Sequence, residues 1–273
     1  MTTPRTSSPV PPAAPDAVVA ALRAAGCVFA EEEAALLAAA ADTPDRLASL
    51  VARRAAGEPL EHVVGWAEFR GLRIDVAPGV FVPRRRTEFL VGRALALAPA
   101  ARVVVDLCCG SGALGAALAA ALPGAELHAA DIDPAAVDCA GRNLAPWGGR
   151  VHHGDLFAAL PAGLRGRVEI LVANVPYVPS ADIRLLPAEA REHEPSAALD
   201  GGPDGLAVLR RVAGGAPAWL APGGCLLAET SGRQAPAARR AFAEAGLIAG
   251  VAVCEDSEAH VITGVLPAAT PAR

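Results

Sequence analysis

The chain has 273 residues and a formal net charge of −5 at pH 7, a length that allows one large domain with a small one. The acidic balance argues against direct binding to nucleic acid, which needs a basic surface that displaces counterions. All basic residues other than histidine are arginines, so Schiff-base catalysis and a P-loop lysine are excluded. The six cysteines form no CxxC pair, which favours reduced thiols and a cytoplasmic protein.

The amino-terminal part divides into a lead and a helical region. Residues 1–15 are rich in Pro, Ser and Thr and lack the apolar stretch of a signal peptide, so we expect a disordered lead. Residues 16–58 carry helical periodicity with an acidic first turn, which predicts a small helical domain. The expected helices cover residues 17–25, 31–41 and 44–55, the last capped by Asp42 or Thr43.

Residues 59–86 change to a β-type pattern. Apolar and polar residues alternate in segments 62–64 and 72–76, and Gly65 and Gly71 interrupt them. This pattern predicts a β-hairpin that links the helical domain to the remainder of the chain.

Residues 87–273 alternate between helical and strand patterns, which is typical of a parallel sheet covered by helices. We expect helices at 88–97, 113–122, 134–143, 206–220 and 235–245, and strands at 102–107, 126–131, 150–154, 168–173 and 225–229. Two last runs, 247–254 and 260–265, predict a closing antiparallel pair. The expected fold is therefore α/β, a seven-stranded, mostly parallel Rossmann-like sheet with a closing antiparallel strand. The uncharged stretch after Asp106 is mostly Ala and Gly with a proline, so no membrane span is predicted.

A glycine-rich loop follows the strand 102–107. Gly110, Gly112 and Gly115 spell GxGxxG, and Asp131 ends the next strand. Glycines let the backbone approach a ligand closely, and the following helix directs its amino terminus at that ligand. Taken alone, the pattern fits a dinucleotide-binding fold, with Asp131 on a ribose hydroxyl.

Two further carboxylates favour S-adenosylmethionine (AdoMet) over NAD. Asp106 lies within the first strand, where a carboxylate repels a pyrophosphate but attracts an ammonium or sulfonium group. Asp155 follows the third strand, where it could accept from an adenine amino group. Cys108 and Cys109 are expected to fill gaps rather than act as nucleophiles. The candidate cofactor-binding residues are Asp106, Cys108, Cys109, Gly110, Ser111, Gly112, Asp131, Ile132, Asp155, Leu156 and Asn174.

The tetrapeptide Asn174, Val175, Pro176 and Tyr177 follows the apolar strand 168–173. A carboxamide, a stiffened turn and an aromatic ring at the carboxyl end of a strand form a cradle for a flat, amide-like nitrogen. These four residues are the candidate catalytic residues.

Together, the loop VVVDLCCGSGALG, the acid Asp131, the pair Asp155-Leu156 and NVPY resemble class I AdoMet-dependent methyltransferases with an (N/D)PP(Y/F) motif. Within that group, residues 59–91 resemble the linker of the protein glutamine N5-methyltransferases, PLxYxxGxxxFxGLxFxVxxGVxxPRPxTExLV. The resemblance extends from about residue 17 to residue 265 and makes residues 87–273 the expected catalytic domain.

The resemblance implies a role for each residue of the tetrapeptide. The Asn174 side-chain oxygen and the Val175 carbonyl accept hydrogen bonds from the substrate carboxamide, and Tyr177 packs against its plane. Pro176 keeps Val175 extended. The nitrogen then attacks the sulfonium methyl in line as the bond from that methyl to sulfur breaks, so no metal and no catalytic His or Lys is expected. The implied substrate is a protein, either the GGQ loop of a peptide-chain release factor or another translation protein, and the enzyme is expected to be a monomer.

The chain also departs from the family pattern, which indicates a divergent branch. Val175 replaces the first proline of NPPY, Leu156 replaces an aromatic residue, Arg85 replaces the proline of PRPxTE, and His62 stands at a tyrosine position. The residues that match the linker, Phe81, Pro83, Arg84 and Thr87, are expected to wall the substrate side, although Phe81 also fits a plain core residue.

Two later segments and two other functions stay open. Residues 194–195 and 201–205 resemble the family's site-covering loop, and they equally fit surface turns. One alternative function is an N6-adenine-type nucleic-acid methyltransferase, because exocyclic base amines are flat and amide-like too. The other is a non-catalytic paralogue that binds AdoMet without turnover.

Overall fold

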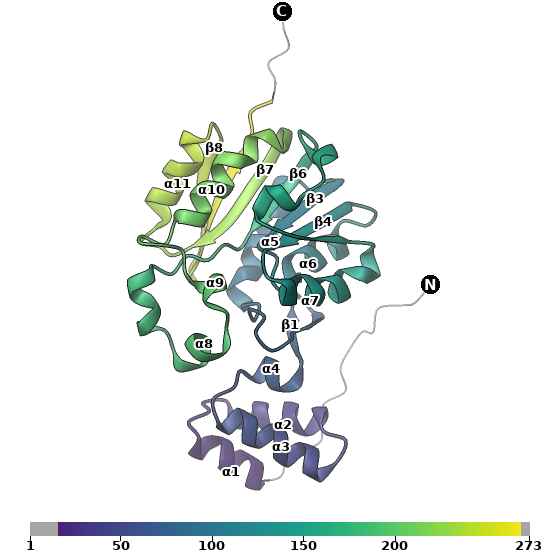
Figure 1. Cartoon of the computed structure of the whole chain (residues 1–273), viewed down its shortest axis with the longest axis vertical. Coiled ribbons are helices and arrows are strands. Elements are labelled where there is room, and N and C mark those ends of the chain that lie inside the picture. The colour runs from purple at the N-terminus through teal and green to yellow at the C-terminus, as the bar shows by residue number, and fades with distance from the viewer. Residues whose placement is uncertain (1–15, 269–273) are drawn as a thin grey trace, which may run out of the picture.

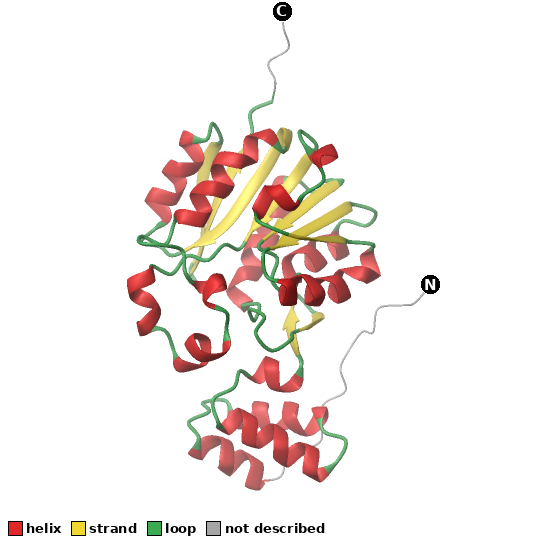
Figure 2. Ribbon diagram, in the orientation of Figure 1, coloured by secondary structure: helices red, strands yellow, loops and turns green. Residues whose placement is uncertain are grey.

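A computed structural model describes residues 16–268 of the chain. The expected disordered lead, residues 1–15, lies outside the described residues. A small helical part stands at one end of the molecule, and a larger part with a central sheet forms the remainder (Figures 1 and 2).

The helical part has a small core of its own, which includes Leu22, Leu37 and Leu50. Thr43 caps the third helix, where its Oγ1 accepts a hydrogen bond from the Arg46 N–H at 3.2 Å, as its side-chain chemistry favours. The helices are α1 (Asp16–Ala24), α2 (Ala30–Ala40), α3 (Pro44–Ala55) and α4 (Leu60–Val64).

Helix α4 corrects one expectation, because residues 62–64 are helical rather than extended. Pro59 precedes the helix, and Gly65 ends it in the left-handed conformation at a φ of 84°, which glycine adopts without strain. The His62 ring holds this turn in place through a 2.8 Å hydrogen bond between Nε2 and the Val80 carbonyl. The linker hairpin itself is present and shorter, as antiparallel strands β1 (Trp66–Phe69) and β2 (Leu72–Asp75).

The large sheet confirms the predicted fold. Its order is β5-β4-β3-β6-β7-β9-β8, with β9 antiparallel to both neighbours and the first four pairs from β5 to β7 parallel. The strands are β3 (Val103–Leu107), β4 (Glu126–Asp131), β5 (Arg150–His153), β6 (Val168–Ala173), β7 (Leu220–Thr230), β8 (Ile248–Cys254) and β9 (Ala259–Val265).

Helices cover both faces of this sheet (Figure 1). Side chains alternate along β3, so Val104 packs into the core on the side of α5 (Glu88–Leu97), α6 (Ala113–Ala121) and α7 (Pro134–Leu144). Val105 packs into the core on the side of α10 (Ala207–Gly215) and α11 (Ala235–Glu244). This period-two alternation decides which way each polar residue of a strand points.

The region after β6 differs from expectation in one helix and one strand. Helix α10 ends at Gly215, because Pro217 falls in a short 3-10 turn, and β7 already begins at Leu220. Between β6 and α10 lie the short helices α8 (Ala188–His193) and α9 (Ser196–Leu199). No helix within residues 16–268 has the length and apolar character that crossing a membrane requires.

Candidate active site

A cavity of about 530 Å³ lies where strands β3, β4 and β6 end. Ligands of open α/β sheets bind at this edge, and the volume falls in the range typical of small-molecule sites. Five segments form most of the cavity wall. They are the loop after β3, residues 131–136 after β4, the tetrapeptide after β6, linker residues between β2 and α5, and residues 186–199, which we call the cover segment.

Asp131 fixes the loop on the cofactor side. Its Oδ2 accepts a hydrogen bond from the Gly110 N–H at 2.9 Å, and its Oδ1 accepts one from the Asp133 N–H at 3.0 Å. Both partners are backbone donors, so the carboxylate retains lone pairs for a ligand. Burial raises the pKa of Asp131, although these hydrogen bonds oppose the shift. Cys108 and Gly110 bend the loop at φ values of 54° and 53°.

Most of the residues expected on the cofactor side reach the cavity wall. They are Cys108, Cys109, Gly110, Ser111, Asp131, Ile132 and Asn174. Burial raises the pKa of the Cys108 and Cys109 thiols far above the usual range, so both are protonated at neutral pH and serve as wall atoms rather than nucleophiles.

Asp106 is placed differently from its expected role. Its side chain is fully buried on the α6 face of the sheet, because it shares that face with Val104. The Oδ2 atom accepts a hydrogen bond from the Gly115 N–H at 2.9 Å, and Oδ1 has no partner in the described part of the chain. Burial raises the pKa of Asp106 to about 7. The carboxyl therefore supports the glycine loop from behind and does not belong to the described cavity wall.

Gly112, Asp155 and Leu156 also stay outside the wall formed by the described residues. Gly112 permits close helix packing, since a Cβ there would lie 3.1 Å from that of Ala140. The Asp155 carboxylate is half-exposed and pairs with the Arg211 guanidinium at 2.6 Å. Leu156 has a φ of 48° and packs against the α10 side of the core. The left-handed backbone at Leu156 thus directs residues 155–156 away from the cavity.

All candidates for the acceptor side line the cavity. They are Phe81, Pro83, Arg84, Thr87, Asn174, Val175, Pro176 and Tyr177. The Asn174 Oδ1 is buried and has no hydrogen-bond partner among residues 16–268. Val175 is 2% exposed and its side chain belongs to the core. An orphaned acceptor at a cavity wall is suited to a ligand N–H donor, because an unpaired buried carbonyl is costly.

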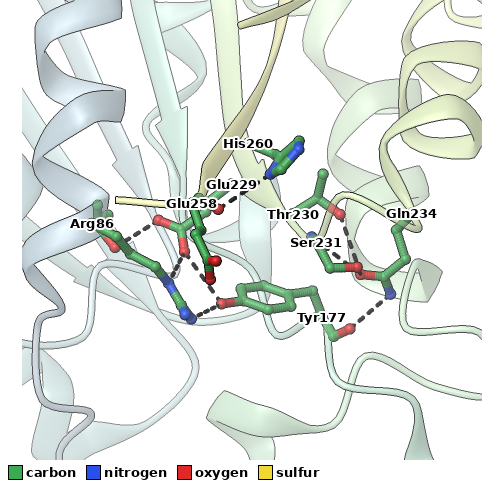
Figure 3. A network of polar contacts seen from close by, with 9 residues as sticks. Arg86, Tyr177, Glu229, Thr230, Ser231, Gln234, Glu258 and His260 are labelled. Atoms are coloured by element: carbon green, nitrogen blue, oxygen red, sulfur yellow. Dashed lines mark hydrogen bonds and ion pairs between the residues drawn. The ribbon is translucent and has the colours of Figure 1, made fainter. Parts of the chain in front are cut away.

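A network around Tyr177 was not found from the sequence (Figure 3). The Glu229 carboxylate, 3% exposed, accepts hydrogen bonds from the Arg86 Nε at 2.8 Å, the Thr87 Oγ1 at 2.7 Å and the Tyr177 hydroxyl at 3.2 Å. Arg86 also donates to the Tyr177 hydroxyl. Arg86 stands at a variable position of the linker pattern, and Glu229 is 143 residues away in the chain. The one signal in the sequence that could have suggested this network is the position of Glu229 at the end of a central strand.

The glycine-rich residues 201–205 lie against the back of the tetrapeptide. The Gln234 Nε2 donates to the Tyr177 carbonyl at 2.8 Å and to the Asp204 carbonyl at 3.0 Å. A Cβ on Gly205 would lie 2.3 Å from the Tyr177 carbonyl oxygen. These residues therefore buttress the candidate catalytic turn instead of forming a free surface turn.

Two ion pairs tie the cover segment to the remainder of the molecule. The Glu194 Oε1 accepts from the Arg84 Nη2 at 2.6 Å and from the Val82 N–H at 3.2 Å, and burial raises the pKa of Glu194. Glu189 pairs with Arg54 of α3 at 3.3 Å. Both acids line the cavity, and so does Pro195. Residues 194–195 are therefore part of the cavity wall and not a free surface turn.

Within residues 16–268, no cluster of three or more His, Cys, Asp or Glu side chains is arranged to hold a metal ion.

Comparison with known proteins assigns the fold to a class. The family model of the methyltransferase small domain matches residues 71–191. The crystal structure of ribosomal protein L11 methylase from Lactobacillus delbrueckii subsp. bulgaricus has the same fold, with a TM-score of 0.52 at 18% identity over 71% of this chain and 85% of that one. The fold is therefore shared with a known methylase, and the segment that matches the methyltransferase small domain includes the glycine-rich loop and the tetrapeptide.

Sequence relatives define the family more closely. The release factor glutamine methyltransferase of Geobacter sulfurreducens is 43% identical over 208 residues, which are 74% of this chain and 72% of that protein. This chain belongs to the release factor glutamine methyltransferase family, as the linker and tetrapeptide indicate. A methyltransferase of Streptomyces pristinaespiralis for 4-amino-L-phenylalanine and 4-methylamino-L-phenylalanine is 40% identical over 197 residues, 70% of this chain and 67% of that protein.

Proposed function

We propose that this chain transfers a methyl group from AdoMet to the N5 nitrogen of a glutamine side chain in a protein, and that this protein is a peptide-chain release factor in the cytoplasm. The observation that carries the proposal is the buried Asn174 Oδ1 at the cavity wall beside Tyr177, an oxygen that has no hydrogen-bond partner within residues 16–268. The family relationship supports the same substrate, because a relative that is 43% identical to this chain over 208 residues is named a release factor glutamine methyltransferase.

The cofactor side fits AdoMet. The Asp131 carboxylate, held only by backbone donors, has lone pairs left for ribose hydroxyls. Ile132 and Ala136 offer apolar wall atoms for an adenine ring, and the loop 108–111 brings the backbone close to the ligand. When bound, AdoMet supplies a methyl group activated by a positively charged sulfur.

The acceptor side orients the nucleophile. An amide nitrogen is a poor nucleophile because its lone pair is delocalised into the carbonyl. The Asn174 Oδ1 and the Val175 carbonyl would accept its two N–H bonds, which raises electron density on nitrogen and fixes the line of attack. The Tyr177 ring would lie against the amide plane. Positioning and electrostatics of this kind contribute most of the rate in such sites.

The relative that acts on 4-amino-L-phenylalanine supports a second candidate, methylation of an aromatic amine on a free amino acid. An aniline nitrogen is flat and would fit the same cradle. The cavity wall also contains the guanidinium groups of Arg84 and Arg86 and the carboxyl of Glu194, which could pair with the two charged groups of a free amino acid.

One experiment decides between these functions. The purified full chain is incubated with methyl-labelled AdoMet and, in separate reactions, with a release factor, 4-amino-L-phenylalanine and total RNA. We expect label on the glutamine of the GGQ loop, shown by mass spectrometry as a gain of one methyl group, and loss of that label in Asn174→Ala. Label only on the free amino acid or on RNA would overturn the proposal. AdoMet binding in calorimetry without transfer to any acceptor would also overturn it.

A further inference from the structure

Tyr177 is the only tyrosine in the chain, and its hydroxyl is not needed for packing against an amide. We propose that Glu229 and Arg86 are positioning residues of the methyl transfer, which hold the Tyr177 hydroxyl and thereby set the plane of its ring at the acceptor site. This inference rests on the proposed function, because it assigns the ring a flat acceptor group.

The far end of the ring is fixed by a buried carboxylate. Glu229 lies near the carboxyl end of central strand β7 and is 3% exposed at its side chain. Its Oε1 atom receives both the Arg86 Nε and the Tyr177 hydroxyl, and its Oε2 atom receives the Thr87 hydroxyl. Arg86 completes a triangle by donating to the Tyr177 oxygen (Figure 3). The Glu229 carboxylate and the Arg86 guanidinium therefore hold the phenol oxygen from two directions.

The near end of the ring is fixed through the backbone. The Gln234 Nε2 holds the Tyr177 carbonyl at 2.8 Å, and the Gln234 Oε1 in turn accepts from the Ser231 hydroxyl at 2.6 Å. Both anchors, Glu229 and the Ser231–Gln234 turn, belong to the end of β7 and the turn before α11. Because one short segment fixes both ends, the ring plane follows the central sheet and not the cover segment.

The ionisation state suits a positioning role. Burial and the neighbouring Glu229 carboxylate raise the pKa of Tyr177 to about 12, although Arg86 opposes the shift. The phenol is therefore protonated at neutral pH, and it donates to Glu229 while it accepts from Arg86. A neutral hydroxyl with one donor and one acceptor partner has its torsion fixed, whereas a phenylalanine ring at this position would be held by packing alone.

Arg86 is the member of this network that the linker pattern does not specify. It occupies the variable position of the linker pattern, so the family resemblance assigns it no role. Its guanidinium is half-exposed and lines the cavity, and its positive charge compensates the buried Glu229 carboxylate. One side chain thus neutralises the anchor and contacts the ring that the anchor holds.

A double-mutant comparison tests the proposal. Tyr177→Phe and Glu229→Gln should each lower kcat with the glutamine acceptor by roughly tenfold, the value of one well-placed hydrogen bond, and leave AdoMet affinity in calorimetry unchanged. If Glu229 acts through the hydroxyl, the double variant loses no more than either single variant. Additive losses would overturn the inference, because they assign Glu229 a separate structural role. Glu258→Gln is the matched control, because Glu258 is exposed and lies beside this network (Figure 3).

A second readout needs no acceptor. Selective ¹³C labelling of tyrosine gives one Cζ resonance, since the chain has a single tyrosine. Arg86→Met and Glu229→Gln should shift this resonance, and Arg85→Met, on the exposed neighbouring arginine, should not. Arg86 is half-exposed, so its variant keeps the test decisive if Glu229→Gln fails to fold. An unchanged resonance in Arg86→Met would overturn the inference. A wild-type enzyme that labels no glutamine overturns the proposed function instead, and leaves this resonance to decide the anchor.

Discussion

The two sides of the cavity are built in different ways. We call the side with residues 108–111, Asp131 and Ile132 the cofactor wall, and the side with linker residues 81–87 and the tetrapeptide the acceptor wall. On the cofactor wall, Asp131 accepts hydrogen bonds from backbone N–H groups of Gly110 and Asp133, which lie close to the same strand ends. On the acceptor side, Glu194 at the wall and Glu229 next to the wall residues Arg86 and Tyr177 accept from arginine side chains 110 and 143 residues away in the chain. The cofactor wall is thus a local product of strand, loop and helix, whereas the acceptor wall is assembled by long-range ion pairs.

This difference separates the roles of the carboxylates. Asp131 keeps lone pairs for a ligand, because its present partners are two backbone donors. The two carboxylate oxygens of Glu229 accept hydrogen bonds from three side chains of the protein itself. A buried carboxylate at or near this cavity can therefore bind a ligand or hold other side chains in place, and its hydrogen-bond partners distinguish the two roles.

The largest expected effect concerns the acceptor wall. Asn174→Ala removes the orphaned Oδ1 and should lower kcat by on the order of 10²–10³, as the loss of one preorganised polar group does at similar sites. AdoMet affinity should be unchanged in calorimetry. Asn174→Asp, which keeps an acceptor oxygen, is the matched control and should retain part of the activity. A parallel fall in AdoMet affinity would show that Asn174 belongs to both walls and would weaken the comparison.

The second prediction tests how the cofactor wall is supported. Burial raises the pKa of Asp106 to about 7 from an ordinary value of 3.8, so the folded chain holds a proton there that the unfolded chain releases. The stabilising contribution is complete below the unfolded pKa and is lost as the pH rises through about 7. Between about pH 8 and pH 5 this group should add about 2–3 kcal/mol to the free energy of unfolding.

Urea unfolding at the two pH values, compared with Asp106→Asn, measures this contribution. The variant should show a pH dependence smaller by that amount, because asparagine cannot titrate. Equal pH dependence in both proteins would mean that Asp106 is not protonated behind the glycine loop.

The third prediction separates two acids that the sequence treated alike. Asp131→Asn should weaken AdoMet binding by roughly tenfold or more, because a charged acceptor of hydroxyl groups is replaced. Asp155→Asn should leave the affinity unchanged, because Asp155 pairs with Arg211 outside the cavity. Isothermal calorimetry on both variants measures the contrast. Equal losses would place Asp155 on the cofactor wall and contradict the geometry.

The sequence predicted the elements and residues that depend on local pattern. Period-two strands, the glycine loop and the tetrapeptide each carry a signal within a few residues. The linker resemblance predicted Phe81 and Arg84 on the substrate side, and both line the cavity. Asp106 was expected on the ligand side because that prediction considered only its position along the strand. It did not consider which face of the sheet the side chain occupies. The Arg86–Glu229 pair left no local signal, since its two members meet only when β7 lies beside the linker.

The smallest predicted effects concern the cover segment. Glu194 is 1% exposed at its side chain and pairs with Arg84 at 2.6 Å, whereas Glu189 is 42% exposed and lies 3.3 Å from Arg54. Glu194→Gln should destabilise the closed cover by about 1 kcal/mol, since a charge-assisted hydrogen bond in a buried setting is weakened. Glu189→Gln should cost at most about 0.5 kcal/mol, because exposed pairs are screened by solvent.

Hydrogen exchange of residues 186–199 measures both variants. Faster exchange in Glu194→Gln than in Glu189→Gln would show that the linker, and not the helical part, holds the cover over the acceptor wall. Equal exchange would mean that the two ion pairs stabilise the cover segment equally. In that case the helical part, through Arg54 of α3, also holds the cover segment over the site.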